Sequence, residues 1–412
     1  MVYTQGQYPT GDLPALATPR SNLRSRAPVN TMHIEATKSG DTLTLALSGR
    51  LDSTSARALA EALQLEGVSS LTLDLEQCRY VSSAGLREIL RAHKSMVTKT
   101  PGLVLTNVHR EVFEVFMLTG FTDLISIRRK VREISIDGLE FMSAGVCGEC
   151  YRLDEETIVK VYNEGISADI AEQEKAFAKA AFVLGIPTAI SYDVVTCGTR
   201  TGVVYEMLDA KLFSVIINND LANMAQHAAA LAEIVRAIHA TTADPAVFPD
   251  LKQKFVGYIN QMDFCVSADD IAFLQAKLAA MPEGDTCVHF DIHTSNIMIR
   301  DSEPVIIDMG DLSRGSYLFD IGLLCTIYGI PELGICELAT KIPTAKGVEL
   351  WELFLKQYFA DKSAEEYAFF HENRYFLAAL RIIYTITFLP KLRDQMVELL
   401  KTVLLPGMRA AA

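Results

Sequence analysis

The stretch from Val288 to Asp311, VHFDIHTSNIMIRDSEPVIIDMGD, constrains this chain more than any other feature. It spaces His289, Asp291 and Asn296 as H-x-D-x-x-x-x-N and places Asp308 twelve residues after the asparagine, behind an apolar run. An aspartate in such a loop can accept the proton of an attacking hydroxyl, and an asparagine with a second aspartate offers oxygens to Mg²⁺. The apolar run reads as a buried strand that would fix the second carboxylate. The spacing predicts a phosphoryl-transfer site rather than a hairpin with polar turns.

Composition limits the other possibilities. At 412 residues the chain is too long for one ordinary core, and its net charge of −13 argues against nucleic acid or an anionic membrane as a partner. The longest apolar stretch, Tyr375 to Leu389, is broken by Arg381 and is too short to span a bilayer. Cys147 and Cys150 form C-x-x-C without a second pair, so no metal site is expected there. With scattered cysteines and no apolar signal segment, a cytoplasmic location is expected.

The chain begins without structural periodicity and continues into a regular α/β pattern. Residues 1–30 mix Pro, Gly, Ser, Thr and Arg and are expected to form a disordered tail. In residues 31–128, strand patterns alternate with helix patterns, which predicts helices packed on a largely parallel sheet. Within it, the turn from Tyr80 to Leu86, YVSSAGL, places Ser82 and Ser83 at the start of a helix. Their hydroxyls can cap the free N–H groups of that helix, and its positive end would also hold a phosphate.

This region resembles the STAS domains of anti-sigma factor antagonists. The resemblance rests on the strand LTLDL, the turn RYVSSAGLREIL and the order of the elements. In that family the serine before the small residue and glycine is phosphorylated by a partner kinase, which implies Ser83 as the phosphoacceptor and an anti-sigma-type kinase or another regulator as partner. The preceding position is often aspartate in the family and is Ser82 here. The domain therefore either carries a working phosphoacceptor, whose charge would repel an acidic partner surface, or only binds a partner.

A second compact unit, residues 138–412, follows a charged segment, residues 129–137, that predicts a linker. The unit opens with FMSAGVCGECYRLDEETIVKVYN, in which Gly145 and Gly148 lie between two strand-like runs. A glycine hairpin lets backbone N–H groups approach phosphates closely, so both glycines are expected to face a nucleotide. Twelve residues after the second glycine, Lys160 lies within an apolar strand. A buried lysine needs a charged partner.

The helix after this strand offers that partner. Ile170, Glu174 and Phe177 share one face at helical spacing, so the glutamate lies on the inward stripe. Glu172 points about 200° away from that face. Glu174 is therefore the predicted partner of Lys160, with Glu172 as the alternative.

Together these motifs resemble a protein-kinase-like fold. The segments HFDIHTSNIMI, IIDMGD and YLFDIG are most similar to the branch of aminoglycoside phosphotransferases and choline kinases, over nearly all of residues 138–412. The resemblance implies a small lobe of residues 138–208 and a helical lobe of residues 209–412. The expected fold class is an α/β STAS-like domain followed by an α+β two-lobed protein-kinase-like domain.

The same resemblance implies ATP and Mg²⁺ as cofactors and a role for each matching residue. Lys160 would hold the α- and β-phosphates, and Asp291 would be the catalytic base. Asn296 and Asp308 would bind Mg²⁺. Asp320 matches an acidic residue that braces the catalytic loop, which is a structural role.

The strand VVYEMLDA matches the hinge between the lobes, so the backbone of Glu206, Met207 and Leu208 would face adenine. Two positions depart from the family pattern, since Ser143 replaces the first glycine of the phosphate loop and Thr294 stands where proline is common. No activation segment ending in Ala-Pro-Glu is present, which disfavours a eukaryotic-type protein kinase. None of these departures removes a catalytic group.

The sequence therefore predicts an ATP- and Mg²⁺-dependent phosphotransferase, coupled to a regulatory STAS domain, that transfers the γ-phosphoryl group to a hydroxyl of a small molecule or protein. The alternative is a partner-switching signalling protein whose kinase-like lobe is a nucleotide sensor or pseudokinase. A combined form would phosphorylate its own Ser83. Four acidic residues of the helical lobe could meet a cationic amine acceptor, although solvated helix ends explain them equally well: Asp220, Asp263, Asp269 and Asp270.

Overall fold

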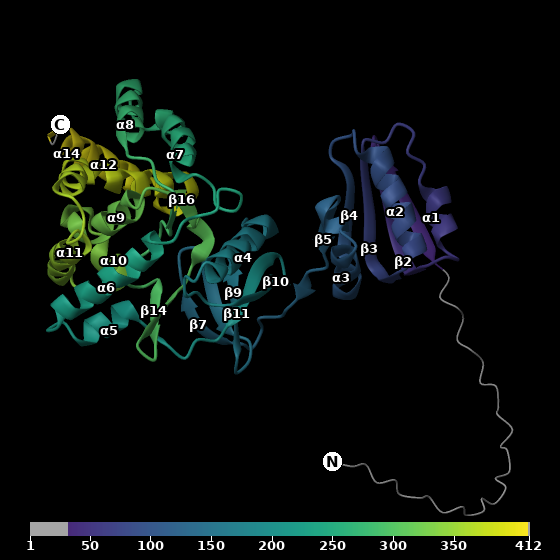
Figure 1. Cartoon of the computed structure of the whole chain (residues 1–412), viewed down its shortest axis with the longest axis horizontal. Coiled ribbons are helices and arrows are strands. Elements are labelled where there is room, and N and C mark those ends of the chain that lie inside the picture. The colour runs from purple at the N-terminus through teal and green to yellow at the C-terminus, as the bar shows by residue number, and fades with distance from the viewer. Residues whose placement is uncertain (1–31, 411–412) are drawn as a thin grey trace, which may run out of the picture. The chain divides into compact units, whose positions relative to one another are not determined.

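The computed structural model describes residues 32–410 (Figure 1). The expected tail, residues 1–30, lies outside the described residues. The chain divides after Val131 into two units, and each has its own hydrophobic core. The two units are the α/β and the two-lobed α+β architectures expected from the sequence.

The expected linker of residues 129–137 is partly structured. Strand β5 (Ser126–Arg129) includes its first residue, and β6 (Arg132–Glu133) pairs in parallel with β10 (Ser191–Cys197) of the second unit. Charged sequences fit such short edge strands because their side chains can face solvent. The boundary between the units therefore falls inside the expected linker, and the connection is shorter than the charge pattern suggests.

The first unit is a five-stranded sheet in the order β1-β2-β3-β4-β5, antiparallel between the first two strands and parallel thereafter. Leu45, Leu73 and Leu105 lie in register on three neighbouring strands and are fully buried. This row forms the centre of the core beneath the helices. The remaining elements are β1 (His33–Ser39), β2 (Thr42–Leu51), α1 (Ala56–Ala62), β3 (Ser70–Val81), α2 (Ser83–Met96), β4 (Gly102–Val108) and α3 (Arg110–Leu118).

The small lobe of the second unit is a six-stranded sheet in the order β6-β10-β11-β9-β8-β7. Val159 and Val161 of β9 belong to one apolar cluster, whereas Tyr162 packs with Ala171 of α4 in another. Because side chains alternate along a strand, Lys160 points to the face that α4 covers. The elements are β7 (Glu140–Ala144), β8 (Gly148–Arg152), β9 (Thr157–Tyr162), α4 (Ala168–Val183) and β11 (Arg200–Glu206).

The helical lobe contains two short sheets, and the H-x-D motif lies in the loop between a strand of one and a strand of the other. Figure 1 shows its helices gathered on one side of the unit and strands β7 to β11 on the other. Its helices are α5 (Phe213–Asn219), α6 (Met224–His239), α7 (Leu251–Asn260), α8 (Ala268–Ala280), α9 (Leu318–Leu324), α10 (Cys336–Thr340), α11 (Thr344–Tyr358), α12 (Ala364–Phe388), α13 (Arg393–Leu399) and α14 (Leu405–Ala410). Its strands are β12 (Lys211–Leu212), β13 (Thr286–Val288), β14 (Ile297–Arg300), β15 (Glu303–Ile306) and β16 (Ser313–Gly315).

Helix α12 is the longest element of this lobe, with 25 residues. Its start is fixed by a capping box between Ser363 and Glu366, in which each side chain bonds the other residue's backbone N–H. Its middle turns are buried against α9, where Gly322 approaches Leu377 so closely that an added Cβ would lie 2.7 Å from the Leu377 carbonyl oxygen. The close approach of α9 and α12 depends on this glycine.

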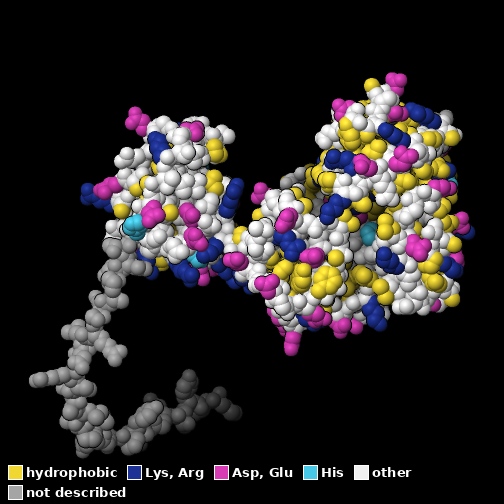
Figure 2. Space-filling view, turned by 180° about the vertical axis from the view of Figure 1, so that it is seen from behind, with side chains coloured by type: hydrophobic (Ala, Val, Ile, Leu, Met, Phe, Trp, Pro, Cys, Tyr) yellow, Lys and Arg dark blue, Asp and Glu magenta, His cyan; other side chains and the backbone are white. Residues whose placement is uncertain are grey.

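Within residues 32–410, no single helix has the length and apolar character needed to cross a membrane. One bent pair, α12 with the helical segment Pro390–Ala410, passes on length and composition with a bend of 115°. Figure 2 shows basic and acidic side chains interspersed on the visible face of each unit. No large area of one charge stands out on that face.

Candidate active site

Lys160 and Glu174 form the ion pair expected from the sequence. Lys160 Nζ donates to Glu174 Oε1 at 2.9 Å. The hydroxyls of Tyr162 and Tyr205 donate to the same carboxylate at 2.5 and 2.7 Å. Glu172, the alternative partner, is exposed. With three donors, the buried Glu174 carboxylate avoids the cost of an unpaired buried charge.

Lys160 also contacts Asp308, so one ammonium group joins two carboxylates. Its Nζ donates to Asp308 Oδ1 at 2.9 Å, across 148 positions of sequence. Burial acts to lower the pKa of Lys160, but Asp308 and Glu174 outweigh it and hold that pKa well above its ordinary value. Burial acts to raise the pKa of Asp308, but Lys160 outweighs it and the pKa is lowered. Both groups are therefore charged at neutral pH.

The loop between β13 and β14 is braced by Asp320 from α9. This fully buried carboxylate accepts the backbone N–H groups of His289 and Phe290 at 2.9 and 2.6 Å, and its Oδ2 lies 3.0 Å from His239 Nε2. Phe290 adopts a left-handed backbone with φ of 60°, which a bulky residue rarely does. The two bonds to Asp320 hold this strained turn, which directs Asp291 into the site. The bracing role inferred for Asp320 agrees with this geometry.

Asp291 and Asn296 lie together within the loop. Asn296 Nδ2 donates to the backbone oxygen of Asp291 at 2.9 Å and to its Oδ2 at 3.0 Å. The Asn296 amide is thereby oriented so that its Oδ1 remains available as an acceptor. Ile307 N–H donates to the Asn296 carbonyl oxygen at 3.0 Å, which ties the loop to the residue before Asp308. The structure thus brings Asp291, Asn296, Asp308 and Lys160 into one site.

Arg381 of α12 completes this site and was not predicted from the sequence. Its Nη2 donates to Asp291 Oδ1 at 2.7 Å, and its Nη1 donates to the Phe290 carbonyl oxygen at 2.9 Å and to Asp311 Oδ2 at 3.2 Å. The Tyr384 hydroxyl donates to the other oxygen of Asp311. Arg381 is the one charged residue between positions 375 and 389. A single cation within an apolar helix pattern was the signal that could have indicated it.

The oxygens of Asn296 and Asp308 fit a Mg²⁺ ion, which takes oxygen ligands and commonly combines one or two carboxylates with phosphates and water. No group of three or more His, Cys, Asp or Glu side chains that could hold a metal occurs within the described part of the chain. Cys147 and Cys150 are free thiols. A bound Mg²⁺ would therefore take its remaining ligands from phosphate oxygens or water.

The two glycines of the β7–β8 hairpin have different roles. A Cβ on Gly148 would lie 2.3 Å from the Val161 carbonyl oxygen, so this glycine is required by close packing of β8 on β9. A Cβ on Gly145 would meet only the Gly148 carbonyl oxygen, at 4.0 Å. Of the two, Gly145 is therefore the position with open space beside its backbone.

The expected hinge follows β11 and connects the lobes. The N–H groups of Glu206 and Met207 donate to Ile190 and Glu156 carbonyl oxygens, at 2.9 and 2.7 Å. Leu208 takes part in no hydrogen bond formed within residues 32–410. The backbone N–H and C=O groups of Leu208 are therefore available to bind a ligand.

Ser83, the candidate phosphoacceptor, is the first residue of α2 and is exposed. Ser82 is the N-cap residue, yet its hydroxyl forms no cap bond and is buried without a hydrogen-bond partner in the described structure. Capping, one of the uses considered for the hydroxyls of this turn, is therefore not the role of Ser82. Ser82 has the extended backbone usual for an N-cap residue. Gly85, in the first turn of α2, lets the helix approach Leu51 of β2 closely.

The first unit defines a class of small α/β domains with an exposed serine at a helix start, and comparison with known proteins identifies that class. Residues 34–127 match the family model described as "Mlab, STAS domain". An anti-sigma-B factor antagonist of Listeria monocytogenes is 30% identical over 98 residues, which are 23% of this chain and 86% of the relative. The corresponding antagonist of Listeria innocua matches to the same extent.

The second unit is a two-lobed kinase-like domain, and residues 143–339 match the model of the phosphotransferase enzyme family. An ADP-bound aminoglycoside phosphotransferase, APH(2'')-Ib, has a TM-score of 0.47 and 17% identity, covering 66% of this chain and 95% of that one. A choline/ethanolamine kinase family protein from Mesorhizobium loti has a TM-score of 0.41 and 14% identity, covering 67% and 92%. The chain belongs to the STAS family through its first domain and joins it to a phosphotransferase-family domain.

Proposed function

We propose that the second domain is an ATP- and Mg²⁺-dependent phosphotransferase and that the STAS domain regulates it or relays its state. The observation that carries the proposal is the convergence of Lys160, Asp308, Asn296 and Asp291, which come from both lobes. Phosphoryl transfer needs a cation at the phosphates, oxygens for Mg²⁺ and an oriented acceptor. These side chains supply all three in one place.

Lys160 would hold the α- and β-phosphates of the nucleotide, since its ammonium stays charged and is fixed by Glu174. Asn296 Oδ1 and the Asp308 carboxylate would hold Mg²⁺, which would neutralise charge on the phosphates. The Leu208 backbone would bind adenine, and the open side of Gly145 would admit phosphate oxygens. Each role uses a group that the fold leaves available or holds in its charged state.

Asp291 would orient the acceptor hydroxyl and receive its proton as the acceptor oxygen forms a bond to the γ-phosphorus. The bond from that phosphorus to the β-phosphate oxygen breaks, and ADP leaves with the electron pair. Because the transition state is loose, orientation contributes more than basicity. Arg381 and Asn296 hold the two oxygens of Asp291 and therefore fix that orientation.

ADP formation in the presence of ATP and Mg²⁺ tests the proposal. Asp291→Ala is expected to reduce the rate at least about 100-fold, the usual effect of losing a positioned acid–base group. Asp269→Ala removes an acidic residue from the first turn of α8 and serves as the matched control. Equal rates for wild type and Asp291→Ala would contradict the assignment of Asp291.

A second candidate function, partner switching, is favoured by the exposed Ser83 at the start of α2 and by the antagonist relatives. Phosphate at this position would add nearly two negative charges to the domain surface. Recovery of binding partners by wild type, Ser83→Ala and Ser83→Asp tests the switch, and equal recovery would contradict it. Intact mass after incubation with ATP tests self-phosphorylation, with Ser83→Ala as control.

A further inference from the structure

Lys254 of α7 is a partly buried cation without a partner. Its ammonium group forms no hydrogen bond or ion pair within the part of the chain that the structure describes, residues 32–410, whereas its backbone N–H donates to the Asp250 carbonyl oxygen at the start of α7. Lys252, two residues earlier on the same helix, donates to Glu283 Oε1 at 2.6 Å and to the Met281 carbonyl oxygen at 2.8 Å. Burial of an ammonium group that lacks an acceptor is costly, so Lys254 is poised for an anion that the chain itself does not supply.

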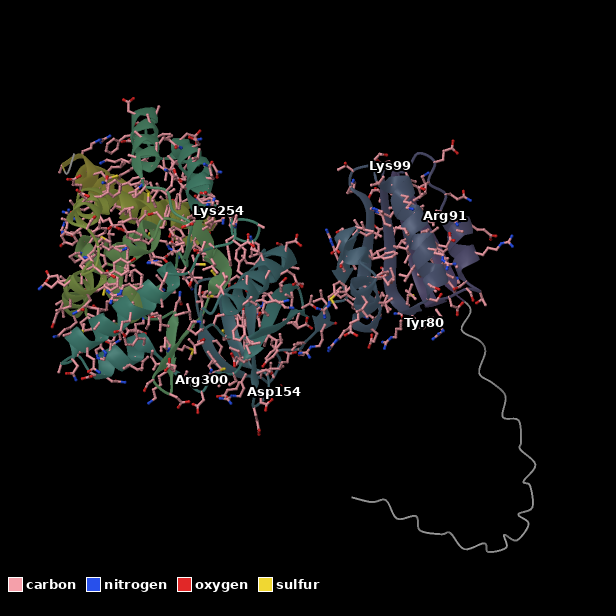
Figure 3. The ribbon with its side chains drawn as sticks, in the orientation of Figure 1. Tyr80, Arg91, Lys99, Asp154, Lys254 and Arg300 are labelled. Carbon is pink, nitrogen blue, oxygen red and sulfur yellow. The ribbon has the colours of Figure 1, made fainter. Side chains whose placement is uncertain are left out.

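Aromatic contacts place this face of α7 beside the catalytic loop. Tyr258, one turn after Lys254, packs edge-on against Tyr384, with ring centroids 6.2 Å apart. Tyr384 in turn donates to Asp311, and Phe255 packs on Phe290 with centroids 5.5 Å apart. Residues four apart share a helix face, so Lys254 extends toward the same region as Tyr258. Figure 3 labels Lys254 at α7, near the side of the helical lobe where the small lobe begins.

Two other buried cations of the site, Arg381 and Lys160, are paired with carboxylates. Arg381 lies between Asp291 and Asp311, and Lys160 lies between Glu174 and Asp308. Burial lowers the pKa of Lys254, and Asp311 offsets this only partly. Among these cations, Lys254 is the one that no carboxylate contacts.

The acidic residues that could have held a cationic amine have local structural partners or lie at helix ends. Asp270 accepts bonds from the Ser267 backbone N–H and hydroxyl in the capping box of α8, and Asp220 accepts two bonds from Asn223. Asp269 lies in the first turn of α8, where negative charge stabilises a helix. None of them contacts Asp291 or Arg381.

We propose that Lys254 binds an anionic group of the phosphate acceptor, so that the acceptor is an acidic hydroxyl compound carrying a carboxylate or a phosphate. This inference rests on the proposed phosphotransferase function. It assigns the face of α7 around Lys254 and Tyr258 to acceptor binding. A cationic amine would place like charge beside an ammonium group that no carboxylate contacts.

ADP formation by the full chain tests this with acceptors that share a carbon skeleton and differ in charge. Glucuronate, glucose and glucosamine form one series, and glycerate, glycerol and glycerol 3-phosphate form another. The acidic members are expected to give a kcat/KM at least about tenfold above their neutral partners, as for one charge-assisted hydrogen bond. Comparison of glycerate with glycerol 3-phosphate shows whether carboxylate or phosphate is preferred.

Lys254→Gln should remove this preference and Lys254→Glu should reverse it, whereas the control Lys252→Gln should retain it. ATP hydrolysis without acceptor should stay within about twofold of wild type in Lys254→Gln, because Lys254 is not assigned to the nucleotide. A wild-type preference for neutral or cationic members, no turnover of any member despite ATP hydrolysis, or a preference unchanged in Lys254→Gln would overturn the inference. A raised KM for ATP in Lys254→Gln would also overturn it. Absence of ATP hydrolysis by wild type would instead contradict the phosphotransferase function.

Discussion

At the level of single residues, each carboxylate oxygen of Asp291 accepts one hydrogen bond and keeps a further lone pair for a substrate hydroxyl. Arg381 occupies Oδ1 at 2.7 Å and Asn296 occupies Oδ2 at 3.0 Å. A carboxylate held at both oxygens cannot rotate, so it presents a fixed acceptor to a substrate hydroxyl. The same guanidinium separates Asp291 from Asp311, whose like charges would otherwise repel each other in a buried site. Arg381 is therefore a positioning residue.

Substitution of Arg381 tests this role. Arg381→Met should lower kcat by about 100-fold with little change in the KM for ATP, because misplacing a catalytic group by about an ångström costs that much. Arg381→Lys keeps the charge but not the paired donors and should recover only part of the activity. Arg374→Met is the control, since Arg374 lies on the same helix and donates to the His371 carbonyl oxygen. Equal loss of thermal stability and activity in both Met variants would indicate a structural role instead.

The hairpin glycines allow a second residue-level prediction. Gly148→Ala should destabilise the protein by about 1–3 kcal/mol, because its Cβ would lie 2.3 Å from the Val161 carbonyl oxygen of β9. Gly145→Ala should change stability by less than about 0.5 kcal/mol, since space is open there. Urea unfolding of both variants measures the difference. Similar midpoints would show that the β8–β9 contact relaxes freely.

At the level of elements, helices α9 and α12 position the site jointly. α9 carries Asp320, which braces the catalytic loop, and α12 carries Arg381, which holds Asp291. The two helices meet at Gly322 and Leu377. The distance between the two helices therefore determines whether Asp320 can hold the loop backbone while Arg381 contacts Asp291.

Widening this contact should affect stability and activity together. Gly322→Ala would place a Cβ 2.7 Å from the Leu377 carbonyl oxygen, so a loss of about 1–3 kcal/mol and a lower kcat are expected. Gly257→Ala on α7 meets nothing within 4 Å and should raise stability by about 0.5–1 kcal/mol. Thermal unfolding and ADP formation measure both effects. Full activity of Gly322→Ala would separate the helix contact from catalysis.

At the level of the whole molecule, the two units have separate cores, one around Leu45, Leu73 and Leu105 and one throughout the helical lobe. Units with their own hydrophobic cores commonly fold on their own. We therefore expect the STAS domain and the kinase-like domain to be independent folding units. Any regulation of one domain by the other would then couple two domains that each keep their own fold.

Calorimetry of the full chain should accordingly show two unfolding transitions. Mg²⁺ and ATP at about 100 times their dissociation constant should stabilise the second domain by about 2.7 kcal/mol and leave the STAS transition unchanged. Asp308→Asn removes the negative charge of a proposed Mg²⁺ ligand and should reduce the shift. A fragment of residues 32–131 should reproduce the STAS transition, and its failure to unfold cooperatively would contradict independent folding.

The sequence alone predicted the features that follow from a local periodicity or from a fixed spacing between residues. Alternating strands and helices predicted the α/β fold of the first unit, and the resemblance of the spaced motifs to kinase-like proteins implied the two-lobed fold of the second. Helical spacing selected Glu174 over Glu172 because side chains four apart share a face. The H-x-D-x-x-x-x-N spacing identified Asp291 and Asn296 as neighbours, since both lie in one short loop.

Only the tertiary structure decided which distant groups meet. The period of α12 shows that Arg381 is unusual but not that its guanidinium reaches Asp291, because that depends on how α9 and α12 pack. Gly148 was assigned to phosphate approach, whereas the structure requires it for the contact with β9. The sequence does not distinguish Lys254 from other helix lysines, whereas the structure shows that no carboxylate of the described residues contacts it. Local patterns depend on residues that are close in the sequence. Contacts across the core depend instead on how helices and strands pack against one another, which the sequence pattern alone does not specify.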